Sequence, residues 1–176
     1  MTRKSKTIYN ILSVILLAFV FYGASRLDPF YGNFSSMAVS PKGYFFILGF
    51  GTLGALLIGY SAYKVHNRLF GILTFVSAML ACITPHSANP SSILANVHVI
   101  FAYTAFFAVS TVTLINIFYF EKDHMKIGET LKTVYLISLA LAIILYLRFM
   151  CVNTVSEVIV ITSLVVIYAV MVNIKK

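Results

Sequence analysis

Residues 84–108 read T-P-H-S-A-N-P-S-S-I-L-A-N-V-H-V-I-F-A-Y-T-A-F-F-A, a loop with two prolines that continues into a long apolar segment. Small residues and one histidine recur in this segment at steps of three and four, the spacing that places side chains on one face of a helix. They are Ala95, His98, Ala102, Ala105 and Ala108. Small residues mark the packed face of a membrane helix. The pattern therefore predicts that His98 points into a helix bundle, about one turn below the membrane surface, and not toward lipid.

The composition of the whole chain also indicates a membrane protein. Of 176 residues, 60% are hydrophobic and 10% are charged, whereas soluble domains are roughly 45–50% apolar and about 25% charged. A net charge of +8 would suggest nucleic-acid binding in a soluble protein. Here the basic residues flank apolar segments, where they set orientation and meet anionic headgroups. We expect a multi-pass protein of the cell membrane, with lipids and not nucleic acid as partners.

Charged and turn residues divide the chain into six apolar segments of about the length that crosses a bilayer as a helix, which is ~20 residues. The predicted fold is all-α, a six-helix transmembrane bundle that forms a single domain over residues 1–176. The predicted spans are residues 8–24, 43–63, 69–84, 93–120, 133–150 and 154–174.

Basic residues are unevenly distributed over the two sides that six spans define. Of the 13 Lys and Arg residues, three lie on one side, namely Arg26, Lys42 and Arg148. The others lie beside the two termini, in the connection at residues 64–68 and in the charge-dense residues 121–132. By the positive-inside rule both termini and a loop over residues 121–132 are predicted to be cytoplasmic. The loops around Pro29, Pro85 and Cys151 then face outward.

Small residues also recur at helical spacing in the second and third predicted spans, and we expect both faces to be packed. They are Gly51, Ala55 and Gly59 in the second, and Gly71, Thr74, Ala78 and Ala81 in the third. Such a face serves contacts within one chain or between copies, so a homo-oligomer is left open.

Polar residues from distant segments are predicted to lie near the outer surface. Ionisable residues within or at the rim of a membrane bundle are costly, which makes each a candidate for function. Arg148 lies at the end of the fifth span, and Glu157 lies near the start of the sixth. The two side chains either form a structural ion pair or face a ligand. The candidate ligand-binding residues are His86, Asn96, His98, Arg148 and Glu157.

Three roles are open for His98. The first is a buried histidine that hydrogen-bonds to a neighbouring helix. The second is a contact for the polar headgroup of an amphiphile that enters from the outer leaflet. The third is a catalytic base or metal ligand. The last role requires further ligands or a nucleophile. Because the sequence has no metal-ligand spacing and no second histidine at matched depth for haem, we predict neither a metal nor a cofactor. Cys82 and Cys151 are interpreted as two buried thiols, although a disulfide between them stays open.

Part of the chain resembles a known family. S-S-M-A-V-S-P-K-G-Y-F-F-I-L-G-F at residues 35–50 is followed by an apolar span, by P-H-S-A-N-P-S-S-I-L-A-N-V-H at residues 85–98, and by an Ala- and Phe-rich span. Over about residues 33–114 this resembles the bacterial six-span family called domain of unknown function number nine hundred and ninety-eight, and more distantly the damage-regulated autophagy modulator proteins. The resemblance implies a fold and a location. It also implies a Ser-containing outer loop and a histidine opening the fourth span, here Ser35, Ser36 and His98.

These observations lead to three hypotheses for function. We expect a non-enzymatic protein that binds or moves a lipid or another amphiphile through an outward-facing polar pocket. An alternative is a substrate-capturing membrane subunit of a larger transporter, since the size and the basic loops resemble those of energy-coupling-factor substrate subunits. A further alternative is an intramembrane lipid hydrolase or transferase, which requires His98 to lie within hydrogen-bond reach of a serine or an acidic residue.

Overall fold

The computed structural model describes residues 2–65, 68–84, 89 and 91–174. In these ranges the backbone forms seven helices and no strand. The helices are α1 (Arg3–Ala24), α2 (Phe34–Met37), α3 (Pro41–Val65), α4 (Arg68–Ile83), α5 (Ile93–Asp123), α6 (Met125–Phe149) and α7 (Thr154–Ile174). The predicted all-α class is confirmed for this part of the chain.

Five of these helices are long and apolar enough to cross a membrane, namely α1, α3, α5, α6 and α7. α4 is apolar but has 16 residues. At a rise of 1.5 Å per residue it extends over about 24 Å, which is less than the hydrocarbon thickness of about 30 Å. The chain is therefore a helical, multi-pass membrane protein by length and composition, and a sixth crossing at residues 69–84 stays a prediction.

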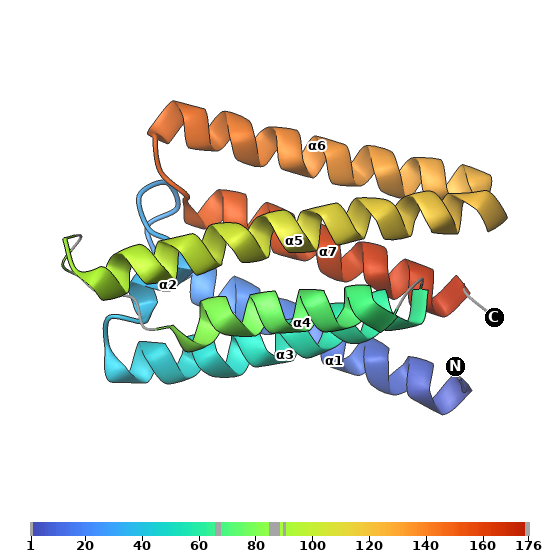
Figure 1. Cartoon of the computed structure of the whole chain (residues 1–176), viewed down its shortest axis with the longest axis horizontal. Coiled ribbons are helices and arrows are strands. Elements are labelled where there is room, and N and C mark those ends of the chain that lie inside the picture. Colours follow the sequence, from blue (N-terminus) through green and yellow to red (C-terminus); the bar gives the residue numbers. More distant parts are fainter. Residues whose placement is uncertain (1, 66–67, 85–88, 90, 175–176) are drawn as a thin grey trace.

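The long helices lie side by side and alternate in direction (Figure 1). Both termini and the α5–α6 connection lie at one end of the bundle, which we call the termini end, and α2 lies at the other, the α2 end. α7 packs against α1, α3 and α6. Ile167, Tyr168 and Met171 of α7 are completely buried. The last helix of the chain thus supplies much of the core.

One face of α6 presents exposed apolar side chains along its length. Leu136, Ile137, Ile143, Ile144 and Leu147 are between 49% and 63% exposed. An exposed apolar surface of this extent is unusual in a soluble monomer. Because hydrocarbon tails are as apolar as leucine, it is suited to contact with lipid.

α3 and α4 approach each other through the small residues that the sequence pattern singles out. A Cβ atom added at Gly59 would lie 3.1 Å from the carbonyl oxygen of Gly71 and 3.0 Å from the Cβ of Phe75. One added at Gly51 would overlap Sγ of Cys82. Larger side chains at these positions would force the helices apart, so the predicted packed faces are confirmed as a contact within the chain.

The predicted loop over residues 121–132 is wrong, because nearly all of this segment is helical. α5 continues to Asp123, α6 begins at Met125, and His124 between them has φ −140° and ψ 58°. Charged residues mark where a helix leaves the hydrocarbon, but they do not end it. Glu, Lys, Leu and Met have high helix propensity, so both helices continue through this charged segment.

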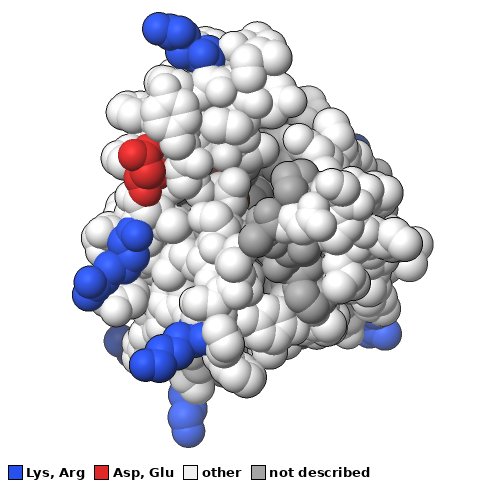
Figure 2. All heavy atoms as spheres, turned by 90° about the vertical axis from the view of Figure 1, so that its left-hand side faces the viewer, with Lys and Arg blue, Asp and Glu red and all other residues white. Residues whose placement is uncertain are grey.

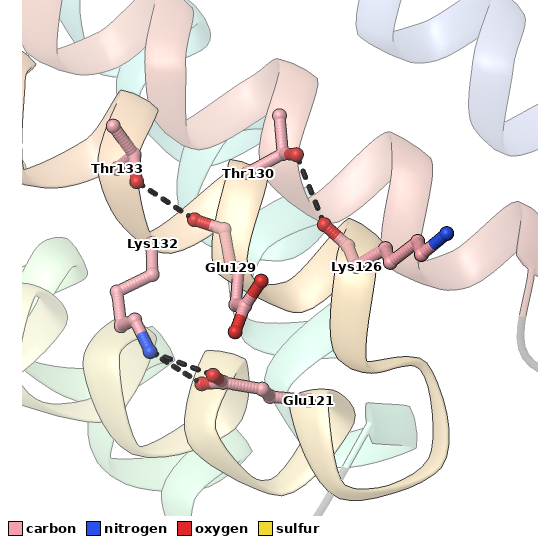
Figure 3. Close-up of polar contacts among 6 residues, drawn as sticks. All are labelled: Glu121, Lys126, Glu129, Thr130, Lys132 and Thr133. Atoms are coloured by element: carbon pink, nitrogen blue, oxygen red, sulfur yellow. Dashed lines mark hydrogen bonds and ion pairs between the residues drawn. The ribbon is translucent and has the colours of Figure 1, made fainter.

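The hairpin between α5 and α6 is closed by an ion pair and by close packing. Nζ of Lys132 donates to both carboxylate oxygens of Glu121, at 2.7 and 2.9 Å (Figure 3). A Cβ atom added at Gly128 would lie 2.5 Å from the Cα and Cβ atoms of Glu121. The absence of a side chain at Gly128 therefore lets the two helices meet directly after the turn.

Buried hydrogen bonds also join helices away from the α2 end. Nδ2 of Asn116 donates to the Tyr168 hydroxyl at 3.1 Å, and Oγ1 of Thr113 lies 3.2 Å from the same oxygen. All three residues are completely buried. Oδ1 of Asn116 has no partner among the described residues. Hydrogen bonds of this kind hold membrane helices together where water is absent.

The two terminal helices are joined at the termini end by a reciprocal pair of amide groups. Nδ2 of Asn10 donates to Oδ1 of Asn173 at 3.2 Å, and Nδ2 of Asn173 donates to Oδ1 of Asn10 at 2.8 Å. Nζ of Lys6 donates to the Asn173 carbonyl oxygen at 2.7 Å. These bonds fix α1 against α7, and the two residues of the amide pair are 163 positions apart in the chain.

Candidate functional site

α2 is one turn of helix, and a capping box fixes its start. Oδ1 of Asn33 accepts a hydrogen bond from the backbone N–H of Ser36 at 2.8 Å, and the Ser36 hydroxyl donates to the Asn33 carbonyl oxygen at 2.6 Å. Asn and Ser at these positions satisfy donors that a helix start leaves free. The Ser36 hydroxyl is thus engaged in the cap, which distinguishes it from the neighbouring Ser35.

His98 connects α5 to α2 and to the residue after α4. Its Nε2 atom lies 3.0 Å from Oγ of Ser35, and its Nδ1 atom lies 2.8 Å from the carbonyl oxygen of Thr84. A carbonyl oxygen only accepts hydrogen bonds. In the neutral ring Nδ1 therefore carries the proton, and Nε2 accepts from the Ser35 hydroxyl.

The surroundings of His98 agree with the helical pattern in the sequence. His98 is 7% exposed, and Ala95 and Ala105 on the same face of α5 are also buried. The prediction that this face points into the bundle is confirmed. Of the three roles considered for His98, a buried histidine hydrogen-bonded to other elements describes its contacts directly.

Glu157, in the first turn of α7, is bound to the same short helix as His98. Its carboxylate accepts a hydrogen bond of 2.7 Å from the backbone N–H of Phe34. The Phe34 side chain is 4% exposed and packs against the ring of Phe50, with the ring centroids 5.4 Å apart. α2 is therefore held by α7 through Phe34 and by α5 through Ser35.

The connection between α1 and α2 is attached to the start of α7. The backbone N–H of Thr154 donates to the Gly32 carbonyl oxygen at 2.7 Å, and the Thr154 hydroxyl donates to the Asp28 carbonyl oxygen at 3.0 Å. Oδ1 of Asp28 accepts from the backbone N–H groups of Phe30 and Tyr31 at 2.9 and 2.8 Å. These bonds give the connection between α1 and α2 a defined conformation and so position α2.

The predicted ion pair between Arg148 and Glu157 is absent from the structure. The Phe34 N–H binds the carboxylate instead. Arg148 is exposed, and its guanidinium carbon lies 5.8 Å from the centroid of the Phe149 ring. An exposed guanidinium keeps its hydration, whereas a buried pair would require both groups to lose theirs.

The remaining candidates are placed differently. Asn96 is exposed on α5, and its side chain forms no hydrogen bond with the described residues. His86 lies outside the described residues. The structure therefore connects two of the five candidates, His98 and Glu157, to adjacent residues of α2, and it does not bring Arg148 or Asn96 to them.

Residue spacing does not predict two of the contacts that His98 makes. Thr84 contributes its backbone carbonyl, a group that every residue carries, so its identity holds no signal. Ser35 is singled out only together with Ser36, by the family resemblance. The choice between them depends on the capping box, which requires knowledge of where α2 begins.

Among the described residues no group of three or more His, Cys, Asp or Glu side chains lies close enough together to hold a metal ion.

Cys82 and Cys151 are both free thiols, so the alternative of a disulfide between them is wrong.

Figure 2 shows the face at the α2 end, with Lys and Arg side chains spread around its edge. Exposed apolar side chains also reach this end. Ile93 and Leu94 at the start of α5 are 81% and 55% exposed, and Val39, which follows α2, is 50% exposed. Polar, charged and apolar surfaces therefore meet here.

A scan against models of protein families finds no match, and searches of curated proteins and of solved structures find none either. The resemblance to the six-span family stays a prediction. Function is therefore inferred from the geometry of the chain.

Proposed function

We propose that this membrane protein binds an amphiphile at the α2 end, with the polar group of the amphiphile against Ser35 and His98. The observation that carries the proposal is the 3.0 Å hydrogen bond between the buried His98 ring and the partly exposed Ser35 hydroxyl. His98 is the one acidic or basic residue in residues 93–120. Such a residue is costly inside an apolar bundle, and its place at the rim supports a role in recognition.

The apolar surface beside this hydrogen bond supports an amphiphile over a small polar solute. Leu94 precedes His98 by four residues and so lies one helical turn away on α5. Leu94 and its neighbour Ile93 are exposed. The polar head of such a ligand can contact Ser35, and its apolar chain can contact this part of α5.

We also infer that α4 completes a sixth crossing and that both termini are cytoplasmic. α4 packs against both α3 and α5, which supports a position inside the same bundle. Basic residues at the termini end include Arg3, Lys4, Lys122, Lys126 and Lys132. The positive-inside rule assigns such an end to the cytoplasm.

Thiol labelling on intact cells tests this orientation. In a background without Cys82 and Cys151, a cysteine at Arg148 should react with a membrane-impermeant maleimide before lysis, and one at Lys126 only after lysis. The reverse pattern would invert the topology, and reaction of both before lysis would contradict an odd number of crossings between these two positions.

The resemblance to the six-span family of unknown function is part of the same proposal. Ser35 and His98, two of the residues that the resemblance singles out, hydrogen-bond to each other. This contact supports membership, because residues far apart in the sequence are then joined in one site.

Native mass spectrometry tests amphiphile binding. We would record spectra of the unchanged chain, of His98→Ala and of Asn96→Ala, each extracted from membranes in mild detergent. Asn96 is the matched control because it lies in the same region of α5 but is exposed. A discrete adduct of lipid-like mass should persist in the unchanged chain and in Asn96→Ala and be lost in His98→Ala. Equal adducts in all three, or none in any, would contradict the proposal.

A further inference from the structure

Ser35, His98 and the Thr84 carbonyl have the relative positions of a nucleophile, its base and a group that orients the base. Nε2 of His98 lies 3.0 Å from the Ser35 hydroxyl oxygen, and Nδ1 is fixed at 2.8 Å from the Thr84 carbonyl oxygen. Both distances lie within the range in which a base activates a serine and is itself held in one tautomer. We propose that Ser35 is an acyl-transfer nucleophile and that the α2 end hydrolyses carboxylic esters of amphiphiles. The choice of an amphiphile rests on the function proposed above.

The exposure of the two side chains agrees with this division of roles. His98 is 7% exposed, so its ring is shielded from water, whereas Ser35 is partly exposed and is reachable from the surface. Exclusion of water strengthens electrostatic interactions at a reacting centre. The neighbouring Ser36 hydroxyl donates to the Asn33 carbonyl oxygen, which assigns the nucleophile to Ser35.

The position of Ser35 is fixed by contacts on both sides of it in the chain. The N–H of Phe34 is bound by Glu157 at 2.7 Å, and the N–H of Ser36 is bound by Asn33 at 2.8 Å. A nucleophile that is held in place before substrate arrives avoids much of the entropy cost of reaching the reactive geometry.

The reaction is an ordinary two-step ester hydrolysis. Oγ of Ser35 forms a bond to the ester carbonyl carbon as its proton passes to Nε2 of His98. The carbon–oxygen bond to the leaving alkoxide then breaks, and His98 returns the proton, which releases the alcohol. A water molecule, deprotonated by His98, attacks the acyl-Ser35 ester, and the proton passes back to Oγ of Ser35. The products are one alcohol and one carboxylic acid, with no change in oxidation state.

Covalent labelling with fluorophosphonates of two chain lengths tests this proposal. The full chain, purified in mild detergent, is treated with a hexadecyl and with an ethyl fluorophosphonate, and the adduct is measured by intact mass and located by peptide mapping. We expect one adduct per chain at Ser35, formed faster with the hexadecyl probe. His98→Gln should slow labelling by roughly 100-fold or more, the usual contribution of a general base. Ser25→Ala, which removes an exposed hydroxyl at the same end, should label like the unchanged chain.

The outcomes distinguish the nucleophile from the class of substrate. An adduct on another residue, or no adduct while native spectra still show a bound lipid, would overturn the nucleophile and leave amphiphile binding intact. Equal rates with both probes at Ser35 would retain the nucleophile and overturn the amphiphilic substrate. The test does not require a Ser35→Ala variant, because peptide mapping on the unchanged chain and the labelling rate of His98→Gln decide between these outcomes.

Discussion

The Glu157 carboxylate accepts a 2.7 Å hydrogen bond from the backbone N–H of Phe34, the residue directly before Ser35. A side chain at the start of α7 therefore determines where a hydroxyl on α2 meets a histidine on α5. This arrangement makes Glu157 a positioning residue. Its role depends on an acceptor oxygen and not on an ion pair.

Replacing Glu157 tests this role directly. Glu157→Ala leaves the Phe34 N–H unpaired, which should lower the free energy of unfolding by about 1–3 kcal/mol and slow fluorophosphonate labelling of Ser35. Glu157→Gln keeps an acceptor oxygen and should retain most of the free energy of unfolding and most of the labelling rate. The measurements are thermal unfolding in detergent and the labelling rate. If Gln were as damaging as Ala, the negative charge and not the hydrogen bond would be what matters.

Gly128 should be intolerant of any side chain. A Cβ atom there would lie 2.5 Å from the backbone Cα of Glu121, so Gly128→Ala must separate α5 from α6 and should cost about 1–3 kcal/mol. The matched control is Gly49→Ala on α3, where a Cβ atom meets nothing within 4 Å and where the change should stabilise by about 0.5–1 kcal/mol. Unfolding curves of the two variants should shift in opposite directions, and equal shifts would contradict the hairpin geometry.

Tyr168→Phe should destabilise the bundle by about 1–2 kcal/mol. The change removes the hydroxyl that accepts from Nδ2 of Asn116, and a buried donor left without a partner is costly in hydrocarbon. Tyr22→Phe is the control, since Tyr22 is 53% exposed and its ring still faces Arg26 without the hydroxyl. Chemical unfolding in mixed micelles measures both, and a neutral Tyr168→Phe would show that Asn116 finds another partner.

The Lys132–Glu121 ion pair should contribute modestly and in a salt-dependent way. The two side chains are 28% and 19% exposed, and pairs of this exposure typically contribute about 0.5–1 kcal/mol at low ionic strength. Lys132→Met should lose this amount at low salt and much less in about 1 M NaCl, where charges are screened. Lys126→Met is the control, because the Lys126 amine points away from Glu121 (Figure 3). An effect of Lys132→Met that does not change with salt would indicate lost packing.

Much of the helical framework could be predicted from the length of the apolar segments and from the spacing of the small residues. The last predicted span, residues 154–174, has the bounds of α7, and the small-residue faces of α3, α4 and α5 are buried or in contact. These features depend on local pattern, which a sequence displays directly. The end of α5 and the start of α6 could not be placed in this way, because charge marks the edge of the hydrocarbon and not the end of a helix.

The candidate site could be predicted only in part. His98 was identifiable as a buried polar residue on a packed face. Its contact with Ser35 joins residues 63 positions apart, and its contact with Thr84 uses a backbone carbonyl. Both contacts depend on how the connections at the α2 end fold back over the bundle. Charge complementarity favoured Arg148 as the partner of Glu157, whereas in the structure the backbone N–H of Phe34 donates to the Glu157 carboxylate.

The position of α7 in the bundle has a consequence for synthesis. α1 precedes α7 in the chain and is therefore synthesised before it, yet Asn10 of α1 has its amide partner, Asn173, on α7. Until α7 enters the bilayer, Asn10 and the buried Asn116 lack the side chains that satisfy them. A chain interrupted before α7 would thus leave the Asn10 amide and the Nδ2 donor of Asn116 without these partners, and only the addition of α7 supplies both.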